Sequence, residues 1–467
     1  MELKNKIFHA SSDDIFLNDR LGRKDNIENI TRLLCNVTSP IVLSVNAPWG
    51  AGKTSFLKML SASLSVSGRK TVYFSAWETD FADDPLLAFL GEMNLAIAPY
   101  LDGDKKKIKA WGNVKKAGAH ILKRSVPVAL KVATVGLIDA DKLIEDESAK
   151  LAETLSKDLI DKYVEDKASI TKFKDSVKSL TRTDVGEVEN LYVFVDELDR
   201  CRPTYAIELL ERIKHLLDVE GLVFVLALDK VQLAHSVKAV YGNEFDASGY
   251  LKRFIDIEYS LPGAPIGLFV DHLYDHFGFV GYFEAREKSH YTRGDGAALK
   301  RALAFFPVSS GMSLRTTEQL FARLNLILLM VKPNQFLYPL FLVFLLVVKE
   351  SYSKEYLDFI SEKSDGSSMI ELLYRLMPGM SHELLYMRID IESMIMASKF
   401  ESNKAWFDKR MRDIKDTAEG IGNDIKLRTY YGDVWRSAND YSGSGFPVQK
   451  IISRIDMLDS FVFDQHA

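Results

Sequence analysis

An apolar run leads directly into a glycine-rich loop in Ile41-Val-Leu-Ser-Val-Asn-Ala-Pro-Trp-Gly-Ala-Gly-Lys-Thr54. The first six of these residues form a short β-branched run after Pro40, which predicts a buried parallel strand over 41–46. After the loop, apolar residues recur at helical spacing until Gly68; they are Phe56, Leu57, Leu60 and Leu64. The stretch therefore predicts a strand, a loop and a helix in succession, which is the setting of a phosphate-binding loop.

The residue types in this loop suit a triphosphate bound together with a metal ion. Gly50 and Gly52 allow the backbone to curl so that successive N–H groups face phosphate oxygens, and the following helix adds its positive N-terminal end. Lys53 offers a positive charge to the β- and γ-phosphates, and Thr54 offers a hydroxyl oxygen to Mg²⁺. Ala47 stands where the usual motif has glycine, but the cradle begins only at Gly50. The candidate nucleotide-binding residues of the loop are Pro48, Trp49, Gly50, Ala51, Gly52, Lys53, Thr54 and Ser55.

A second apolar run ends in two carboxylates, in Leu191-Tyr-Val-Phe-Val-Asp-Glu197. A strand of this kind, lying beside the strand of the phosphate loop, would deliver Asp196 to Mg²⁺ through a coordinated water. It would also deliver Glu197 to the attacking water as the general base. The alternative is that the two acids only cap a loop, but the phosphate loop earlier in the chain favours the catalytic interpretation.

Three further runs complete a predicted five-stranded sheet, namely 72–75, 222–228 and 255–261. Helical stretches such as Tyr205–Leu217 alternate with the strands, which predicts a parallel sheet with helices on both faces. The strand signal disappears within an insertion of helical periodicity and again after about Gly267. We therefore expect an α/β fold, in which a parallel-sheet P-loop NTPase core carries a helical insertion and a C-terminal α-helical domain. The expected divisions are 1–92 and 190–266 for the two parts of the core, 93–189 for the insertion and 267–467 for the helical domain.

Composition and charge narrow the class of protein further. The 467 residues are 47% hydrophobic and carry a net charge of −5, which excludes a polycation and leaves a local basic patch open. Two cysteines, Cys35 and Cys201, are too few for a disulfide framework, and charges at the N-terminus do not suit a signal peptide. The apolar run 333–348 contains Pro339 and is short for a membrane span, so we expect a buried helix there. The stretch 120–138 is interrupted by charges and proline, and a cytoplasmic protein is predicted.

The chain resembles the KAP family of P-loop NTPases over roughly residues 10–265, and weakly at 313–315. The strings that carry the resemblance are Trp49-Gly-Ala-Gly-Lys-Thr54, Val72-Tyr-Phe-Ser-Ala-Trp77, Val195-Asp-Glu-Leu-Asp-Arg-Cys-Arg-Pro203, Phe224-Val-Leu-Ala-Leu-Asp229, Val240-Tyr-Gly242, Tyr250-Leu-Lys-Arg-Phe254 and Leu261-Pro262. The resemblance implies an ATPase core with a catalytic glutamate and an additional strand between the phosphate-loop strand and the acidic strand. Family members often carry transmembrane helices in the insertion, whereas the insertion here is charged. Some bacterial members are linked to exclusion of phage or other mobile elements, so a role in phage defence is an expectation by analogy.

Three residues outside the two motifs are further candidates. Arg200 and Arg253 could each present a guanidinium to the γ-phosphate, within the chain or in a neighbouring subunit, or could form structural salt bridges such as one from Arg200 to Asp199 or Glu208. Asp229 could sense the γ-phosphate through a water or act only as a turn residue. His272 and His276 have the i, i+4 spacing of metal ligands but no accompanying glutamate or cysteine, and we expect ordinary surface histidines.

A basic cluster lies in the insertion, at 105–109, 115–116 and 123–124, with Trp111 among the lysines. Within 105–138 it could dock peripherally on anionic lipid, or bind nucleic acid with Trp111 stacking on a base. The plainer interpretation is a solvated helical face.

Together these features predict an Mg²⁺-dependent ATPase of KAP type, with ATP and Mg²⁺ as cofactors. Its cycle would drive a conformational or assembly switch that involves a protein partner or self-assembly. The predicted catalytic residues are Glu197, Lys53, Arg253 and Arg200, and Thr54 and Asp196 are the predicted metal ligands. Two alternatives are a nucleotide-gated switch with little turnover and a membrane-associated scaffold.

Overall fold

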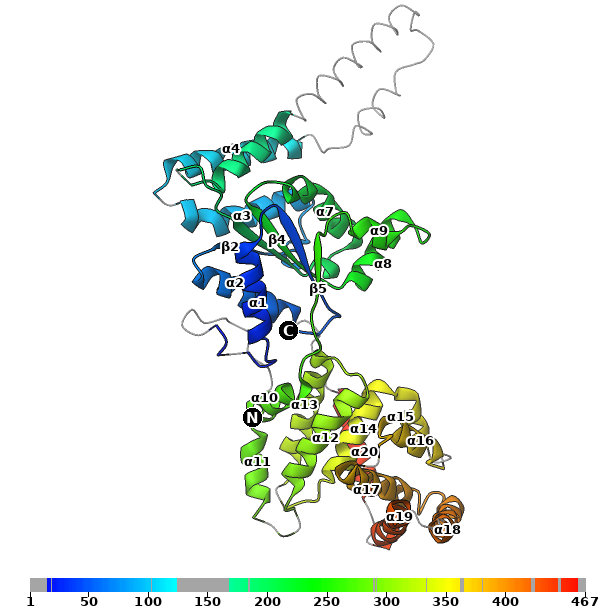
Figure 1. Ribbon diagram of the computed structural model, residues 1–467. Helices are drawn as coiled ribbons and strands as arrows, with labels where there is room; N and C mark the ends of the chain where they lie inside the picture. The colour runs from blue at the N-terminus through cyan, green and yellow to red at the C-terminus, as the bar shows by residue number, and fades with distance from the viewer. Residues whose placement is uncertain are drawn as a thin grey trace, which may run out of the picture. The chain divides into compact units, whose positions relative to one another are not determined.

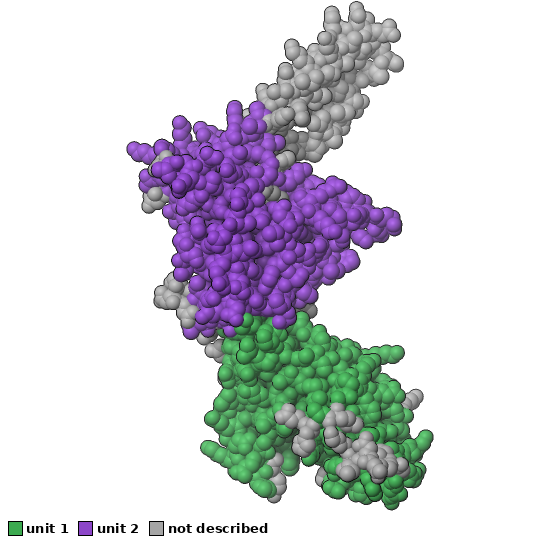
Figure 2. All heavy atoms as spheres, viewed as in Figure 1, with its two compact units in different colours: residues 1–7, 20–22, 264–467 green, residues 8–19, 23–263 purple. Residues whose placement is uncertain are grey.

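The computed structural model divides the chain into two compact units (Figure 2). One unit contains residues 8–19 and 23–263, and the other contains residues 1–7, 20–22 and 264–467. The residues that the structure describes are 15–17, 19–101, 103–123, 168–183, 185–288, 290, 292–332, 334–361, 365–379, 381–420, 425–443 and 447–460. Among these, no helix has the length and apolar character that crossing a bilayer requires. Most of the stretch 120–138 lies outside the described residues.

A parallel five-stranded sheet forms the centre of the first unit, in the order β2-β3-β4-β1-β5 (Figure 1). Its strands are β1 (Ile41–Asn46), β2 (Lys70–Ser75), β3 (Leu191–Asp196), β4 (Leu222–Leu228) and β5 (Ile257–Ser260). The expectation that the acidic strand lies beside the phosphate-loop strand is therefore wrong, because β4 separates β3 from β1. All seven residues of β4 are buried, as suits an inner strand, and its insertion agrees with the additional strand that the family resemblance implied.

Alternate residues of the strands build two separate cores, one on each face of the sheet. Leu43 and Phe194 point to the face covered by α1 (Lys24–Asn36) and α2 (Lys53–Val66). Val193 and Phe224 point to the opposite face. The helices on that second face are α3 (Pro85–Leu101), α4 (Lys105–Lys123), a helical segment at 168–180, α7 (Pro203–Leu217), α8 (Lys230–Tyr241) and α9 (Ala247–Leu251) (Figure 1). This three-layer arrangement is the predicted α/β fold with helices on both faces.

Trp111 does not have the exposure that the nucleic-acid alternative for the insertion required. Its side chain is only 4% exposed, and its indole N–H donates a 2.8 Å hydrogen bond to Asn94 Oδ1 on α3. The ring belongs to the apolar face of α4 together with Val114, whereas Lys105 and Lys109 lie on the exposed face. Because i, i+3 spacing places Trp111 and Val114 on one side of the helix, the tryptophan packs inward and cannot stack on a base.

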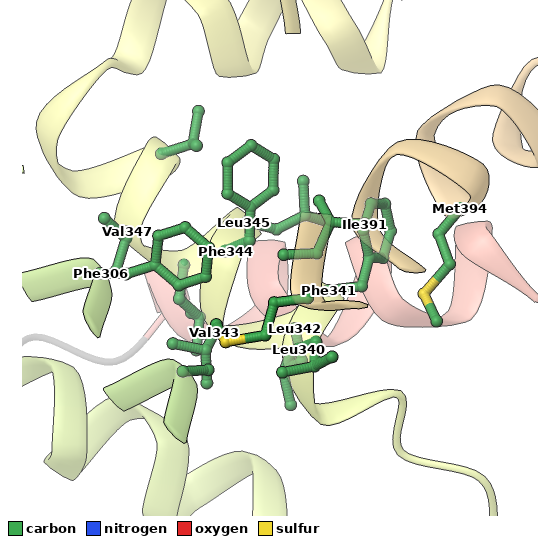
Figure 3. Close-up of a cluster of buried hydrophobic side chains, with 14 of the residues drawn as sticks. Phe306, Leu340, Phe341, Leu342, Val343, Phe344, Leu345, Val347, Ile391 and Met394 are labelled. Atoms are coloured by element: carbon green, nitrogen blue, oxygen red, sulfur yellow. The ribbon is translucent and has the colours of Figure 1, made fainter. Parts of the chain in front are cut away.

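The second unit is α-helical throughout its described residues, as the sequence predicts. Its helices are α10 (Ile266–His276), α11 (Phe279–Arg286), α12 (Asp295–Ser309), α13 (Leu314–Met330), α14 (Pro339–Ser351), α15 (Ser353–Ile360), α16 (Ser367–Leu376), α17 (His382–Ser398), α18 (Lys404–Gly420), α19 (Ile425–Gly443) and α20 (Val448–Met457). Residues 339–348 of the run 333–348 are buried in α14, which begins at Pro339, a residue suited to a first helical turn. Phe306 of α12 and Ile391 of α17 pack against it (Figure 3).

Asp390 on α17 makes the stability of this helical unit depend on pH. Burial raises the pKa of its carboxyl from 3.8 to about 6, and the charge of Arg301 only partly opposes that rise. A carboxyl whose pKa is raised on folding costs stability above the folded pKa, and the cost disappears as the pH falls below the unfolded value. We expect Asp390→Asn to stabilise the unit by about 1–2 kcal/mol at pH 8 and to have no effect near pH 4. Calorimetric melting at the two pH values measures this, and an equal effect at both would contradict it.

Candidate functional site

The phosphate-loop candidate connects β1 to α2 at the carboxyl edge of the sheet. Gly50 and Gly52 have φ angles of 77° and 85°, in the left-handed region that side chains other than glycine rarely adopt. No side chain caps the N-terminus of α2, where Gly52 is the N-cap residue. The first N–H groups of a helix have no partner within the helix, so this end provides donors and a positive dipole to an anion.

Lys53 directs its ammonium group back over the loop. Its Nζ lies 2.7 Å from the carbonyl oxygen of Ala47, 3.3 Å from that of Pro48, and 3.5 Å from Oδ2 of Asp199. The side chain is only 9% exposed. Because the backbone carbonyl of residue 47 makes the contact, alanine in place of glycine at this position leaves it intact.

The two predicted metal ligands meet at the end of β3. Asp196 is 1% exposed, its carboxylate accepts a hydrogen bond from the hydroxyl of Tyr73, and the hydroxyl of Thr54 interacts with it as well. The backbone N–H of Glu197 donates to its Oδ1 at 2.8 Å. Burial raises the pKa of Asp196, and the hydrogen bonds from Tyr73 and Thr54 oppose that rise. A hydroxyl and a carboxylate oxygen are the hard ligands that Mg²⁺ prefers, so this donor set fits a magnesium–nucleotide complex.

Glu197 occupies a strained position immediately after β3. Its φ of 62° is left-handed, which is uncommon for a residue other than glycine and often accompanies function. Both carboxylate oxygens have partners: the hydroxyl of Ser75 donates to Oε2 at 2.9 Å, and Nη1 of Arg200 donates to Oε1 at 2.7 Å. The guanidinium of Arg200 also lies 5.8 Å from the ring centroid of Trp77. Arg200 therefore pairs with Glu197, and neither Asp199 nor Glu208 is the partner as the sequence suggested.

Asp199 is a site residue that the sequence analysis did not select. It lies in the 3₁₀ turn η3 (Leu198–Arg200) after β3 and is 5% exposed. Its Oδ2 accepts hydrogen bonds from the indole N–H of Trp49 at 2.7 Å and from the backbone N–H of Asp229 at 2.9 Å. The available signal was a third acid, three residues after Asp196, in a string that already carried two candidates.

Asp229 follows β4 and caps α8, because its Oδ1 accepts hydrogen bonds from the backbone N–H groups of Val231 and Gln232. This geometry matches the turn-residue interpretation of Asp229. Arg253 is exposed and precedes β5, near the beginning of β1, where the N–H of Asp256 bonds the carbonyl of Val42. Strands run parallel here, so Arg253 lies at the edge of the sheet opposite the phosphate loop, and the structure does not bring it to the other candidates within one chain.

The two paired histidines belong to α10 in the helical unit. Their rings stack with centroids 5.9 Å apart. Burial, then the charges of Arg20 and His276, lower the pKa of His272 to about 4. Within the described residues, no group of three or more His, Cys, Asp or Glu side chains is arranged to hold a metal ion.

Comparison with known proteins agrees with the geometry of the loop. A family model described as the KAP family P-loop domain matches residues 23–264, just over half of the chain. No curated protein matches. One similar solved structure is titled "Structure of the Aeropyrum Pernix ORC2 protein (ADPNP-ADP complexes)"; it is 12% identical, with 94% of this chain and 93% of that chain covered and a TM-score of 0.31.

Proposed function

Because the chain belongs to the KAP family of P-loop domains, we propose that it is an Mg²⁺-dependent ATPase whose cycle drives a conformational or assembly switch. The observation that carries the proposal is the meeting of Lys53, Thr54, Asp196 and Glu197 at one edge of the sheet. These residues together provide a cation for phosphate, oxygen ligands for a metal and a base for water. The family resemblance supports defence against phage or mobile elements as the setting of this switch.

Each residue has a distinct task in the proposed reaction. The N-terminus of α2 and the loop backbone bind the phosphates. The ammonium group of Lys53 gives up one of its present partners and donates a hydrogen bond to a phosphate oxygen instead. Thr54 and Asp196 hold the metal ion, which when bound supplies positive charge to the phosphate oxygens. Glu197 orients the attacking water and accepts its proton.

Calorimetric titration with ATP, ADP and GTP, with and without Mg²⁺, tests binding, and release of inorganic phosphate tests hydrolysis. We expect ATP to bind more tightly with Mg²⁺ and phosphate to be released over many turnovers. Absence of binding by any of the nucleotides to folded protein would contradict the proposal. Comparing the affinities for GTP and ATP in the same titration measures which nucleotide the site prefers.

The engaged state of Glu197 favours one alternative, a nucleotide-gated switch that turns over little. The bonds from Ser75 and Arg200 occupy one acceptor position on each carboxylate oxygen, so the attacking water has to reach one of the positions that remain. In this alternative, nucleotide binding is retained and hydrolysis waits for a partner or a second copy of the chain to release Glu197. Arg253, exposed at the opposite edge, is a candidate for a guanidinium donated to a neighbouring copy.

The contact between Arg200 and Glu197 gives a specific prediction for turnover. If the guanidinium of Arg200 restrains Glu197, Arg200→Ala should raise basal ATP hydrolysis about fivefold. A fivefold change corresponds to about 1 kcal/mol, which is the strength expected for one hydrogen bond to a charged group at a partly exposed site. The matched control is Arg202→Ala, because Arg202 pairs with Asp80 and not with Glu197. Steady-state phosphate release measures both variants. A fall in turnover for Arg200→Ala would instead support its assignment as a γ-phosphate finger.

A further inference from the structure

Three segments of the first unit converge on the carboxylate of Asp199. Trp49 belongs to the phosphate loop, Lys53 begins α2, and Asp229 follows the inner strand β4. A single oxygen, Oδ2, receives the indole N–H at 2.7 Å, the backbone N–H of Asp229 at 2.9 Å, and the approach of the Lys53 ammonium at 3.5 Å. The Asp199 side chain is 1% exposed, so these contacts lie in a region of low dielectric where charge-assisted hydrogen bonds are strong.

The three contacts differ in kind. The bonds from Trp49 and from the Asp229 backbone have direct hydrogen-bond lengths, whereas the 3.5 Å separation from Lys53 is electrostatic attraction. Lys53 also donates to two carbonyls of its own loop. Its contact with Asp199 is therefore the one that a phosphate oxygen can replace, and the two shorter bonds can persist when nucleotide binds.

Trp49 depends on this bond for its position. The side chain is 49% exposed, so burial holds it only weakly, yet its indole N–H reaches a buried carboxylate. The residue lies between Ala47 and Gly50, beside the two glycines that give the loop its conformational freedom. Fixing Trp49 to the end of β4 through Asp199 removes part of that freedom before a ligand arrives, which reduces the entropy lost on binding.

We propose that Asp199 is a positioning residue that pre-organises the phosphate loop for a nucleoside triphosphate by holding Trp49 on the end of β4. The inference rests on the proposed nucleotide binding and adds the residue that prepares the site. Asp199 touches neither the phosphates nor the metal ion in this proposal; it acts through Trp49 and the loop backbone. The contact between Lys53 and Asp199 keeps the ammonium group near the phosphate site until a phosphate oxygen replaces the carboxylate as its partner.

Four variants separate this role from a purely structural one. Asp199→Ala removes the anchor, and Asp199→Asn keeps a planar oxygen that can accept both short bonds but has no charge. Trp49→Phe keeps an aromatic ring and removes only the indole donor. Trp111→Phe is the matched control, because Trp111 donates a 2.8 Å bond to Asn94 Oδ1 in the insertion, away from the loop.

Calorimetric titration with ATP and Mg²⁺ gives the first readout. We expect Asp199→Ala to weaken binding about tenfold and Trp49→Phe about fivefold, as the loss of one hydrogen bond implies. Asp199→Asn should restore affinity to within about threefold of the unmodified chain. Combining Trp49→Phe with Asp199→Ala should cost little more than Asp199→Ala alone, because both remove the same bond. Trp111→Phe should lower the melting temperature and leave affinity unchanged.

A nucleotide-free measurement tests the anchor independently of the proposed function. With 5-fluorotryptophan incorporated, the ¹⁹F resonance of Trp49, assigned by its loss in Trp49→Phe, should shift and narrow in Asp199→Ala while that of Trp111 stays in place. An unmoved Trp49 resonance would overturn the inference, as would unchanged ATP affinity in folded Asp199→Ala. If the unmodified chain binds no nucleotide but the resonance moves, the anchor stands and the nucleotide proposal fails.

Discussion

Lys53→Ala is expected to weaken the binding of ATP with Mg²⁺ by at least about 100-fold. A hydrogen bond between an ammonium group and phosphate is worth about 1.5–3 kcal/mol, and the 9% exposure of the side chain places it toward the upper end of that range. The substitution also removes the group that joins the carbonyls of Ala47 and Pro48 to Asp199, so the empty loop loses an internal support. Both effects weaken binding, and calorimetric titration measures their sum.

Lys58→Ala is the matched control for this experiment. Lys58 lies on the same helix, α2, five residues after Lys53 and about 140° around the helix axis, since successive residues turn by about 100°. Its removal changes the net charge equally and should leave ATP affinity within about twofold of the unmodified chain. If Lys53→Ala and Lys58→Ala bind ATP with equal affinity, the loop that contains Lys53 does not bind the triphosphate.

The strands and the loop were predictable from local sequence because each of their signals is local. A continuous apolar run predicted β4 over 222–228, and the structure has Leu222–Leu228. The run 41–46 likewise corresponds to β1. Gly50 and Gly52 predicted a curled backbone before Lys53, and both adopt left-handed φ angles there. Such patterns report how a segment is buried and how its backbone turns, and both depend on neighbouring residues.

The parts that escaped prediction depend on pairing between distant segments. The order of β3, β4 and β1 cannot be read from any one strand, since each is apolar enough to be an inner strand, and only the family resemblance implied the strand between β3 and β1. The bond between Trp49 and Asp199 joins residues 150 positions apart. Lysines surround Trp111 in the sequence, which left a stacking role for it open, whereas the helix turns Lys105 and Lys109 to the exposed face and the ring to the core. The lysines and the tryptophan of this segment left open a surface that binds nucleic acid. The geometry of the helix determines which of these side chains are exposed.

Arg200 illustrates the same limit within the site itself. The sequence offered Asp199, Glu208 and a phosphate as partners, all of them plausible at that spacing. The structure pairs Arg200 with Glu197, because Leu198–Arg200 forms a 3₁₀ turn that brings residue i+3 back over the left-handed Glu197. The turn thus connects the candidate base to an arginine, and any change that straightens it also frees the carboxylate.

Glu197→Gln is expected to lower ATP hydrolysis by at least about 100-fold while ATP binding is retained. General-base assistance typically contributes 10²–10⁴-fold, and the amide cannot accept a proton from water at neutral pH. The fold should survive, because the glutamine oxygen can still accept from Arg200 and its NH₂ group can donate to the hydroxyl of Ser75. Single-turnover phosphate release measures the chemical step, and calorimetric titration of the same sample measures binding.

The assignment of Glu197 is decided by comparing three substitutions. Glu208→Gln removes the charge of an exposed acid on α7 and should leave hydrolysis unchanged, which controls for loss of negative charge. Lys53→Ala should lose binding and hydrolysis together, whereas Glu197→Gln should lose only hydrolysis, because the base contributes in the transition state and not to the grip on the phosphates. If Glu197→Gln hydrolyses ATP as fast as the unmodified chain, Glu197 is not the base. The nucleotide-gated switch is then the better account of a carboxylate that Ser75 and Arg200 already hold on both oxygens.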